Sequence, residues 1–339
     1  MSDPVQALSI AVLVPCFDEE AAIGKVVADF RAALPSARIY VYDNNSRDRT
    51  VEVAQAAGAI VRTERLQGKG NVVRRMFADV EADVYVMVDG DDTYDASASA
   101  GLVRALVDDG ADMVNAVRVS TIEAAYRPGH RFGNALLTTM VAWIFGDRVS
   151  DMLSGYRVFS RRFVKSFPAL SAGFEIETEL TVHALELRMP MAQRETTYKD
   201  RPPGSQSKLR TFRDGFRILG TIGRLLARER PTAFYGALGA ALAIAAVVLA
   251  VPLLITWLDT GLVPRFPTAI LCTGLMMLAS LAITAGLVLD TVTHHRRETR
   301  RLAYLGVPGV SATTLAASVQ APGADLERRD GLVSRKASR

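Results

Sequence analysis

The chain has 339 residues, 49% of them hydrophobic, and 40 basic against 36 acidic residues give it a net charge of +4. This length exceeds one typical domain, and the positive mean hydropathy indicates that part of the chain is not water-soluble. The two isolated cysteines, Cys16 and Cys272, exclude a disulfide scaffold and are expected to be packing residues.

Short apolar strands alternate with amphipathic helices over the first 120 residues. Strands are predicted at 8–14, 38–42, 59–62, 84–88 and 112–117, with helices at 20–34, 48–57, 70–80 and 96–108. This alternation predicts an α/β domain with a mostly parallel, Rossmann-like sheet. The N-terminal stretch lacks a basic region and has only a short apolar run, so it is expected to be a strand rather than a signal peptide.

Polar residues follow three of the predicted strands, at 15–20, 43–46 and 89–92. Ligands bind at the carboxyl ends of parallel strands, so these loops are expected to converge on one crevice. A carboxylate cluster without His or Cys suits Mg²⁺ or Mn²⁺, which commonly bridges a protein to a diphosphate. Asp and Gly are also ordinary turn formers, and the acidic run alone leaves both interpretations open.

A less regular region follows, with helices expected at 130–145 and 175–187 and a strand at 191–198. Residues 151–157 lie between the helices, and we expect this region to form the acceptor half of the site. The second helix contains Glu175, Glu177 and Glu179. Only Glu175 and Glu179 share a helix face, so a solvated acidic face is at least as well supported as a role in the site.

The C-terminal third carries two uncharged apolar runs, 233–258 and 268–289, each long enough to cross a bilayer. An amphipathic helix at 211–230 is expected to lie in the membrane interface, and the polar, basic chain beyond residue 305 is typical of a disordered tail. Arginine-rich flanks place both ends of the hairpin in the cytoplasm, as a multi-pass inner-membrane protein, and account for the basic charge without nucleic-acid binding. The predicted domains are therefore 1–210, 211–231, 232–292 and 293–339.

Six motifs occur in a specific order. They are VPCFDEE at 14–20, DNNSRDRT at 43–50, GKGNVVRRMF at 68–77, VDGDDTYD at 88–95, DMLSGYRVFSRR at 151–162 and YKDRPPGSQSKL at 198–209. In this order the chain resembles inverting family 2 glycosyltransferases of the GT-A fold, within them the polyprenyl-phosphate (dolichol-phosphate mannose synthase-like) type. The resemblance implies transfer of a sugar from a UDP- or GDP-sugar to undecaprenyl or dolichyl phosphate at the cytoplasmic membrane face, with Mg²⁺ or Mn²⁺.

The resemblance also implies roles for individual residues. The donor would be bound by Pro15, Asp18, Glu19, Asp43, Lys69 and Asp89, and the metal by Asp89 and Asp91. The acceptor phosphate would be bound by Arg118, Asn134, Arg201, Ser205, Ser207 and Lys208. The catalytic group would comprise Asp91, Arg131 and Asp151, the last as a base or a positioning group.

The chain departs from the family pattern at two places. The loop from Arg201 to Lys208 is one residue longer than the R-x-x-G-x-S-K pattern, and Thr93 stands where some relatives have a Gln beside the metal. An anionic lipid phosphate needs no general base, which agrees with the lack of a convincing catalytic His.

Two alternatives stay open. One is a polysaccharide or lipid-linked oligosaccharide glycosyltransferase of the same fold, and the other a non-catalytic nucleotide-sugar-binding membrane protein. The charged flanks and the amphipathic helix are also compatible with a homo-oligomer.

Overall fold

The computed structural model describes residues 8–119, 150–173, 175–199 and 226–310, together with the single positions 139, 141, 143 and 223. The chain divides into two compact units. The first comprises Met1–Pro128, Val149–Lys208 and Arg301–Arg339, and the second Gly129–Arg148 and Leu209–Arg300.

The first unit is built on a seven-stranded sheet with the order β3-β2-β1-β4-β6-β5-β7. The strands are β1 (Ile10–Cys16), β2 (Arg38–Asp43), β3 (Ile60–Thr63), β4 (Val84–Met87), β5 (Met113–Val119), β6 (Arg157–Ser160) and β7 (Met191–Thr197). All neighbouring strands are parallel except β6, which runs antiparallel to both β4 and β5. The predicted mostly parallel α/β sheet is confirmed.

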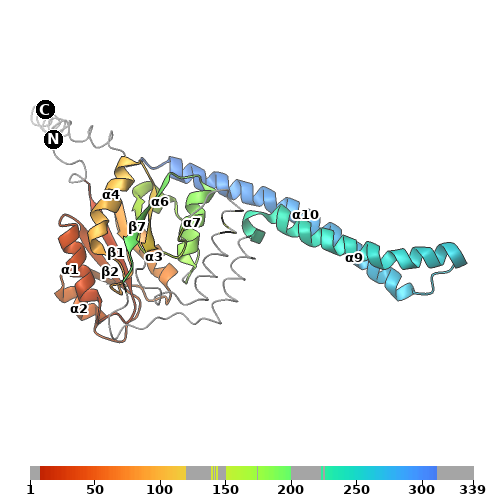
Figure 1. The fold of residues 1–339 in the computed structure, drawn as a ribbon, viewed down its shortest axis with the longest axis horizontal. Helices are drawn as coiled ribbons and strands as arrows, with labels where there is room; N and C mark the ends of the chain where they lie inside the picture. Colours follow the sequence, from red (N-terminus) through yellow and green to blue (C-terminus); the bar gives the residue numbers. More distant parts are fainter. Residues whose placement is uncertain are drawn as a thin grey trace, which may run out of the picture. The chain divides into compact units, whose positions relative to one another are not determined.

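Helices cover both faces of the sheet (Figure 1). One face carries α1 (Ile23–Ala33), α2 (Thr50–Ala56) and α4 (Ser99–Asp108), the last preceded by the 3₁₀ turn η2 (Ala96–Ala98). The other face carries α3 (Lys69–Asp79), α6 (Arg161–Ser166) and α7 (Ile176–Glu186). Strand side chains alternate between two cores: Val84 and Val86 of β4 pack in one, Tyr85 and Met87 in the other.

Strand β6 and helix α6 were not predicted. The strand is short and begins with Arg157, whose side chain is 0% exposed, so its sequence lacks the apolar run by which the other strands are recognised. The predicted helix at 96–108 is divided into η2 and α4 because the Asp95 side chain caps a separate turn by accepting from the Ser97 N–H.

The second unit contains α9 (Pro231–Thr260) and most of α10 (Phe266–Leu305), both long and apolar enough to cross a membrane. Their apolar side chains are largely exposed, for example Val248 at 63% and Leu281 at 62%. The helices approach closely at Gly239, where an added Cβ would lie 2.9 Å from the Ala279 carbonyl oxygen. The predicted helices at 130–145 and 211–230 lie mostly outside the described residues, as does the chain beyond 310.

Candidate active site

The loops after β1, β2 and β4 meet at one edge of the sheet, as expected. The end of β1 is in register with the end of β2, with Cys16 opposite Asp43, and β4 lies on the other side of β1. The loops after β1 and β2 are joined by several hydrogen bonds, among them one of 2.9 Å from the Asp18 N–H to Ser46 Oγ and one of 2.7 Å from the Arg47 N–H to Asp18 Oδ1. A ligand-binding crevice at this edge of the sheet stays a prediction.

Three of the six residues expected to bind the donor, namely Asp18, Glu19 and Asp43, lie in or next to the loops after β1 and β2 and also shape them. Asp18 adopts a left-handed conformation with φ of 53°. The N–H of the buried Glu19 donates to Thr50 Oγ1 at 2.8 Å. Asp43 is buried and accepts from the N–H groups of Asn45 and Ser46. Pro15, which was also expected to bind the donor, lies in β1 opposite Tyr42.

Asn44 organises the loop between β3 and α3, a role that the sequence did not reveal. Its side-chain amide donates to the carbonyl oxygens of Glu64 and Leu66, and its Oδ1 accepts from the Gly68 N–H at 2.7 Å. One buried amide thus fixes the path of the chain into α3.

The glycines on either side of Lys69 allow another backbone segment to lie directly against the start of α3. An added Cβ on Gly68 would lie 2.2 Å from the Ala172 carbonyl oxygen, and one on Gly70 would lie 2.0 Å from that of Ser171. The Gly70 N–H donates to Ala172 at 3.0 Å, and Gly68 has φ of +130°. Residues 171–172 occupy the space beside these glycines, which brings the start of α7 next to Lys69.

The Lys69 ammonium bridges two carboxylates from different elements. Its Nζ lies 2.5 Å from Asp89 Oδ1 and 2.5 Å from Glu177 Oε1. Burial by itself lowers the pKa of an ammonium, but the two carboxylates outweigh burial and raise the pKa of Lys69. The ammonium therefore stays charged beside the acidic loop.

Glu177 is a site residue to which the sequence analysis assigned no role. It lies near the start of α7, its side chain is 6% exposed, and burial raises its pKa although Lys69 partly offsets that effect. Within the described residues its Oε2 has no hydrogen-bond partner. The signal was available: Glu177 shares a helix face with the buried Leu180 and Ala184, and a carboxylate on an apolar face needs a counter-charge.

Asp89 and Asp91 follow β4, as predicted. Asp91 is buried and accepts from Thr93 Oγ1 at 2.6 Å, whereas the side chain of Asp89 is 29% exposed. Asp92 points elsewhere: it has φ of 56° and pairs with Lys25 of α1 at 3.0 Å. Asp92 therefore has a structural contact, whereas Asp89 and Asp91 stay the predicted metal-side pair.

These two carboxylates fit a divalent cation. The Lys69 ammonium against Asp89 shows that this carboxylate accommodates a positive charge. No group of three or more potential metal-ligating side chains occurs in the part of the chain that the structure describes. Mg²⁺ keeps several waters and needs only one or two carboxylates together with substrate phosphates, so a pair is sufficient.

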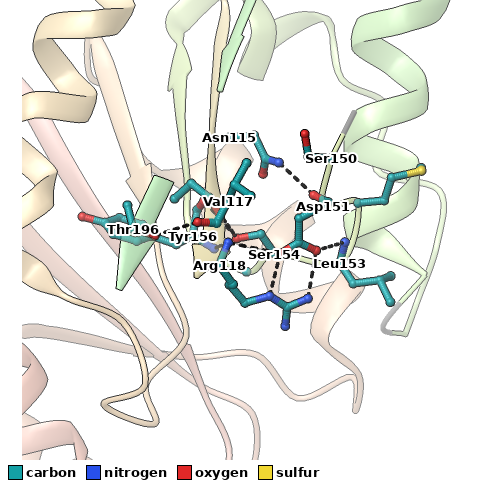
Figure 2. Close-up of polar contacts among 12 residues, drawn as sticks. Asn115, Val117, Arg118, Ser150, Asp151, Leu153, Ser154, Tyr156 and Thr196 are labelled. Carbon is teal, nitrogen blue, oxygen red and sulfur yellow. Dashed lines mark hydrogen bonds and ion pairs between the residues drawn. The ribbon is translucent and has the colours of Figure 1, made fainter. Parts of the chain in front are cut away.

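Arg118 and Asp151 form a two-point ion pair (Figure 2). The guanidinium Nε and Nη2 donate to the Asp151 carboxylate at 2.7 and 2.9 Å, and the guanidinium carbon lies 5.3 Å from the centre of the Tyr198 ring. Burial by itself would raise the pKa of Asp151, but Arg118 outweighs burial and lowers that pKa. A lowered pKa makes Asp151 a weak base and favours its positioning role.

Arg157 holds the segment that carries Asp151. It is completely buried, and its guanidinium donates to the carbonyl oxygens of Met152 and Ser154 and to Thr181 Oγ1. Burial lowers the pKa of this guanidinium to about 10. Gly155 in the same segment approaches the acidic loop, since an added Cβ would lie 2.2 Å from Asp89 Oδ2. The segment is thereby fixed against Asp89.

The remaining predicted site residues lie outside the described residues. They are Arg131, Asn134, Arg201, Ser205, Ser207 and Lys208. Their roles stay predictions.

A sheet of this topology is similar to a solved GT-A-like structure. That protein is glucosyl-3-phosphoglycerate synthase from Mycobacterium tuberculosis in complex with Mn²⁺, uridine diphosphate and glucosyl-3-phosphoglycerate. It superimposes with a TM-score of 0.54 at 22% identity, over 67% of this chain and 81% of that one. The likeness assigns the class of fold, which is that of GT-A glycosyltransferases.

Sequence comparisons give the family. The model for glycosyl transferase family 2 matches residues 11–167. Glycosyltransferase AglJ of Haloferax volcanii is 30% identical over 304 residues, covering 88% of this chain and 98% of the relative. A dolichyl-phosphate hexose transferase of Haloferax volcanii is 27% identical over 221 residues, covering 65% of this chain and 95% of the relative. The chain belongs to glycosyltransferase family 2.

Proposed function

We propose that the protein moves a hexose from a nucleotide diphosphate to a polyprenyl phosphate at the cytoplasmic face of a membrane, with inversion at the sugar. The observation that carries this proposal is the acidic loop after β4, in which Asp89 lies against the Lys69 ammonium, in a chain that also has two exposed apolar helices. The similarity to a dolichyl-phosphate hexose transferase supports the lipid acceptor.

The two apolar helices support a membrane location. A soluble protein rarely exposes so much contiguous apolar surface as α9 and α10 do. Both helices exceed the length needed to cross a bilayer, and basic residues follow the apolar part of α10. This arrangement supports a two-span hairpin with both ends on the cytoplasmic side, where a lipid-linked acceptor would be within the membrane that anchors the enzyme.

On the donor side, Asp89 and Asp91 would hold Mg²⁺ or Mn²⁺. The bound cation would neutralise the negative charge that develops on the departing nucleoside diphosphate. Lys69 supplies a second, fixed positive charge next to Asp89. Because the ammonium is already buried and oriented, little reorganisation is needed when the leaving group becomes charged.

On the acceptor side, Arg118 would bind the lipid phosphate. Its guanidinium is held by Asp151 and by the Tyr198 ring, which fixes its orientation before an anion arrives. The acceptor phosphate is itself anionic at neutral pH and attacks the anomeric carbon without losing a proton to the enzyme. The lowered pKa of Asp151 agrees with a site that needs no general base.

Replacing the buried metal-side carboxylate should abolish transfer. Membranes containing Asp91→Asn, incubated with labelled UDP- or GDP-sugars and undecaprenyl phosphate, are expected to form glycolipid at least about 10²-fold more slowly than wild type. EDTA should stop the wild-type reaction and Mn²⁺ should restore it. The matched control is Asp92→Asn, since Asp92 contacts Lys25 and its left-handed conformation suits Asn. Unchanged turnover in Asp91→Asn would refute the site assignment.

A further inference from the structure

Lys69 contacts two carboxylates, and only one of them, Asp89, is also proposed to bind a metal ion. Asp89 comes from the loop after β4 and Glu177 from α7, and both lie 2.5 Å from the ammonium. Asp89 is the more exposed of the two and is the one proposed to hold a cation, whereas Glu177 is buried.

A divalent cation and the Lys69 ammonium compete for Asp89. Two positive charges on one carboxylate repel each other, and this repulsion is weakly screened where the side chains are withdrawn from water. Lys69 is 10% exposed, so its ammonium cannot escape into solvent without losing its buried position. A cation therefore binds Asp89 well only if another acceptor keeps the ammonium in place.

Glu177 can serve as that acceptor because its position is fixed to the start of α3. Glu179, one position beyond the intervening Thr178, accepts from the N–H groups of Leu170 and Ser171 at 3.0 and 2.8 Å. Residues 171–172 in turn pack on the glycines that flank Lys69. The helix that carries Glu177 and the helix that carries Lys69 are thus joined through residues 170–172, by the Glu179 carboxylate on one side and by backbone contacts on the other, independently of Asp89.

Glu177 can also accept a further hydrogen bond. Its Oε1 already accepts from Lys69, and its buried Oε2 has no hydrogen-bond partner in the described part of the chain. An unpartnered buried carboxylate oxygen is costly unless a donor reaches it in some state of the protein. A small movement of the ammonium away from Asp89 would let Lys69 engage both oxygens of Glu177.

We infer that Glu177 is a positioning residue that retains the Lys69 ammonium and so releases Asp89 for a divalent cation. The inference rests on the proposed function of Asp89 and Asp91 as the metal-side pair. Glu177 acts here through Lys69 and does not touch the cation itself.

The test is Mn²⁺ binding to purified full-length protein in detergent, without nucleotide or acceptor. Free and bound Mn²⁺ are measured by electron paramagnetic resonance for wild type, Glu177→Gln, Lys69→Met and the double variant. Glu177→Gln is expected to raise the Mn²⁺ dissociation constant about threefold or more, because Lys69 is left with Asp89 alone. In the Lys69→Met background the same change is expected to have no effect beyond about twofold.

Two controls separate this mechanism from simpler ones. Glu52→Gln removes the same charge at an exposed position of α2 that is not part of the cluster and should leave Mn²⁺ binding unchanged. If Glu177→Gln does not fold, Glu177→Asp keeps the charge on a shorter side chain and should give a smaller loss that also disappears with Lys69→Met.

Four results would overturn the inference or show which proposal has failed. Wild-type affinity in Glu177→Gln would overturn it, as would an equal loss in both backgrounds, which would mean that the charge of Glu177 acts directly on the cation. Unchanged Mn²⁺ binding in Asp91→Asn would instead refute the metal site itself. Normal Mn²⁺ results without any glycolipid product would leave the role of Glu177 standing and refute the proposed transfer.

Discussion

Two carboxylate clusters lie at opposite ends of the strands and differ in how many of their carboxylate oxygens accept hydrogen bonds. Asp112, just before β5, is 1% exposed and accepts from Ser160 Oγ, Arg162 Nε and Tyr304 Oη. The cluster of Asp89 at the carboxyl edge has a part-exposed member and an oxygen of Glu177 without a partner among the described residues. A buried charge by itself therefore does not indicate a binding site. A carboxylate oxygen without a hydrogen-bond partner, at the carboxyl ends of the strands, is the more informative signal.

Removing the Arg118 guanidinium tests whether the Arg118–Asp151 ion pair stabilises the fold, as the fully hydrogen-bonded Asp112 cluster does. Arg118→Met leaves a buried carboxylate without its partner and is expected to lower the free energy of unfolding by about 3 kcal/mol at pH 7. Chemical denaturation of the first unit in detergent measures this effect. The control Arg194→Met breaks an exposed pair with Asp109 and should change stability by less than about 0.5 kcal/mol.

The same variant has a defined pH dependence. In wild type the pKa of Asp151 lies below its ordinary value of 3.8, so the pair stabilises the fold above that pH and the stability is lost as pH falls through the folded-state pKa. In Arg118→Met, burial without the guanidinium raises the pKa of Asp151. The stability difference from wild type should then narrow as pH is lowered from neutral, and a constant difference would contradict this assignment.

Gly155→Ala should disturb the cluster of Asp89, Lys69 and Glu177 without removing any charge. The added Cβ would lie 2.2 Å from Asp89 Oδ2, and the flexible carboxylate can move aside, so the change should displace Asp89 and not unfold the protein. A misplacement of about 1 Å can lower the rate about 10²-fold. Initial rates of glycolipid formation measure this loss. Gly101→Ala is the control, because its Cβ would have no neighbour within 4 Å; equal rates for the two variants would contradict the prediction.

Tyr304→Phe should weaken the hydrogen-bonded cluster around Asp112 only slightly. It removes one hydrogen bond of 2.8 Å to Asp112 but retains the ring, over which Arg162 lies at 4.7 Å. The expected loss is about 1 kcal/mol in the free energy of unfolding, measured by thermal or chemical denaturation. The kcat/KM for glycolipid formation should stay unchanged, and a fall in kcat/KM without a fall in stability would show that the Asp112 cluster participates in the reaction.

Much of the parallel sheet could be predicted because its strands are apolar and its helices amphipathic, with ends that mostly fall within three residues of those observed. Strand β6 could not be, because its buried Arg157 is stabilised by carbonyl oxygens that only the folded chain supplies. The acidic pair after β4 was recognisable from its place in a motif. Glu177 could be suspected from its place on an apolar helix face, but its partner Lys69 could not be identified, since Lys69 lies 108 positions earlier in the chain.

That separation has a consequence for biosynthesis. The strands that carry the acidic loops are all synthesised before residue 119, yet Lys69 obtains its second partner, and the glycines beside it their covering segment, only when residues 171–177 have emerged from the ribosome. A nascent chain that stops short of α7 therefore has the acidic residues of the site but a lysine that only Asp89 holds. The proposed donor half becomes complete only when these residues have been synthesised, ahead of the first apolar helix, which begins at Pro231.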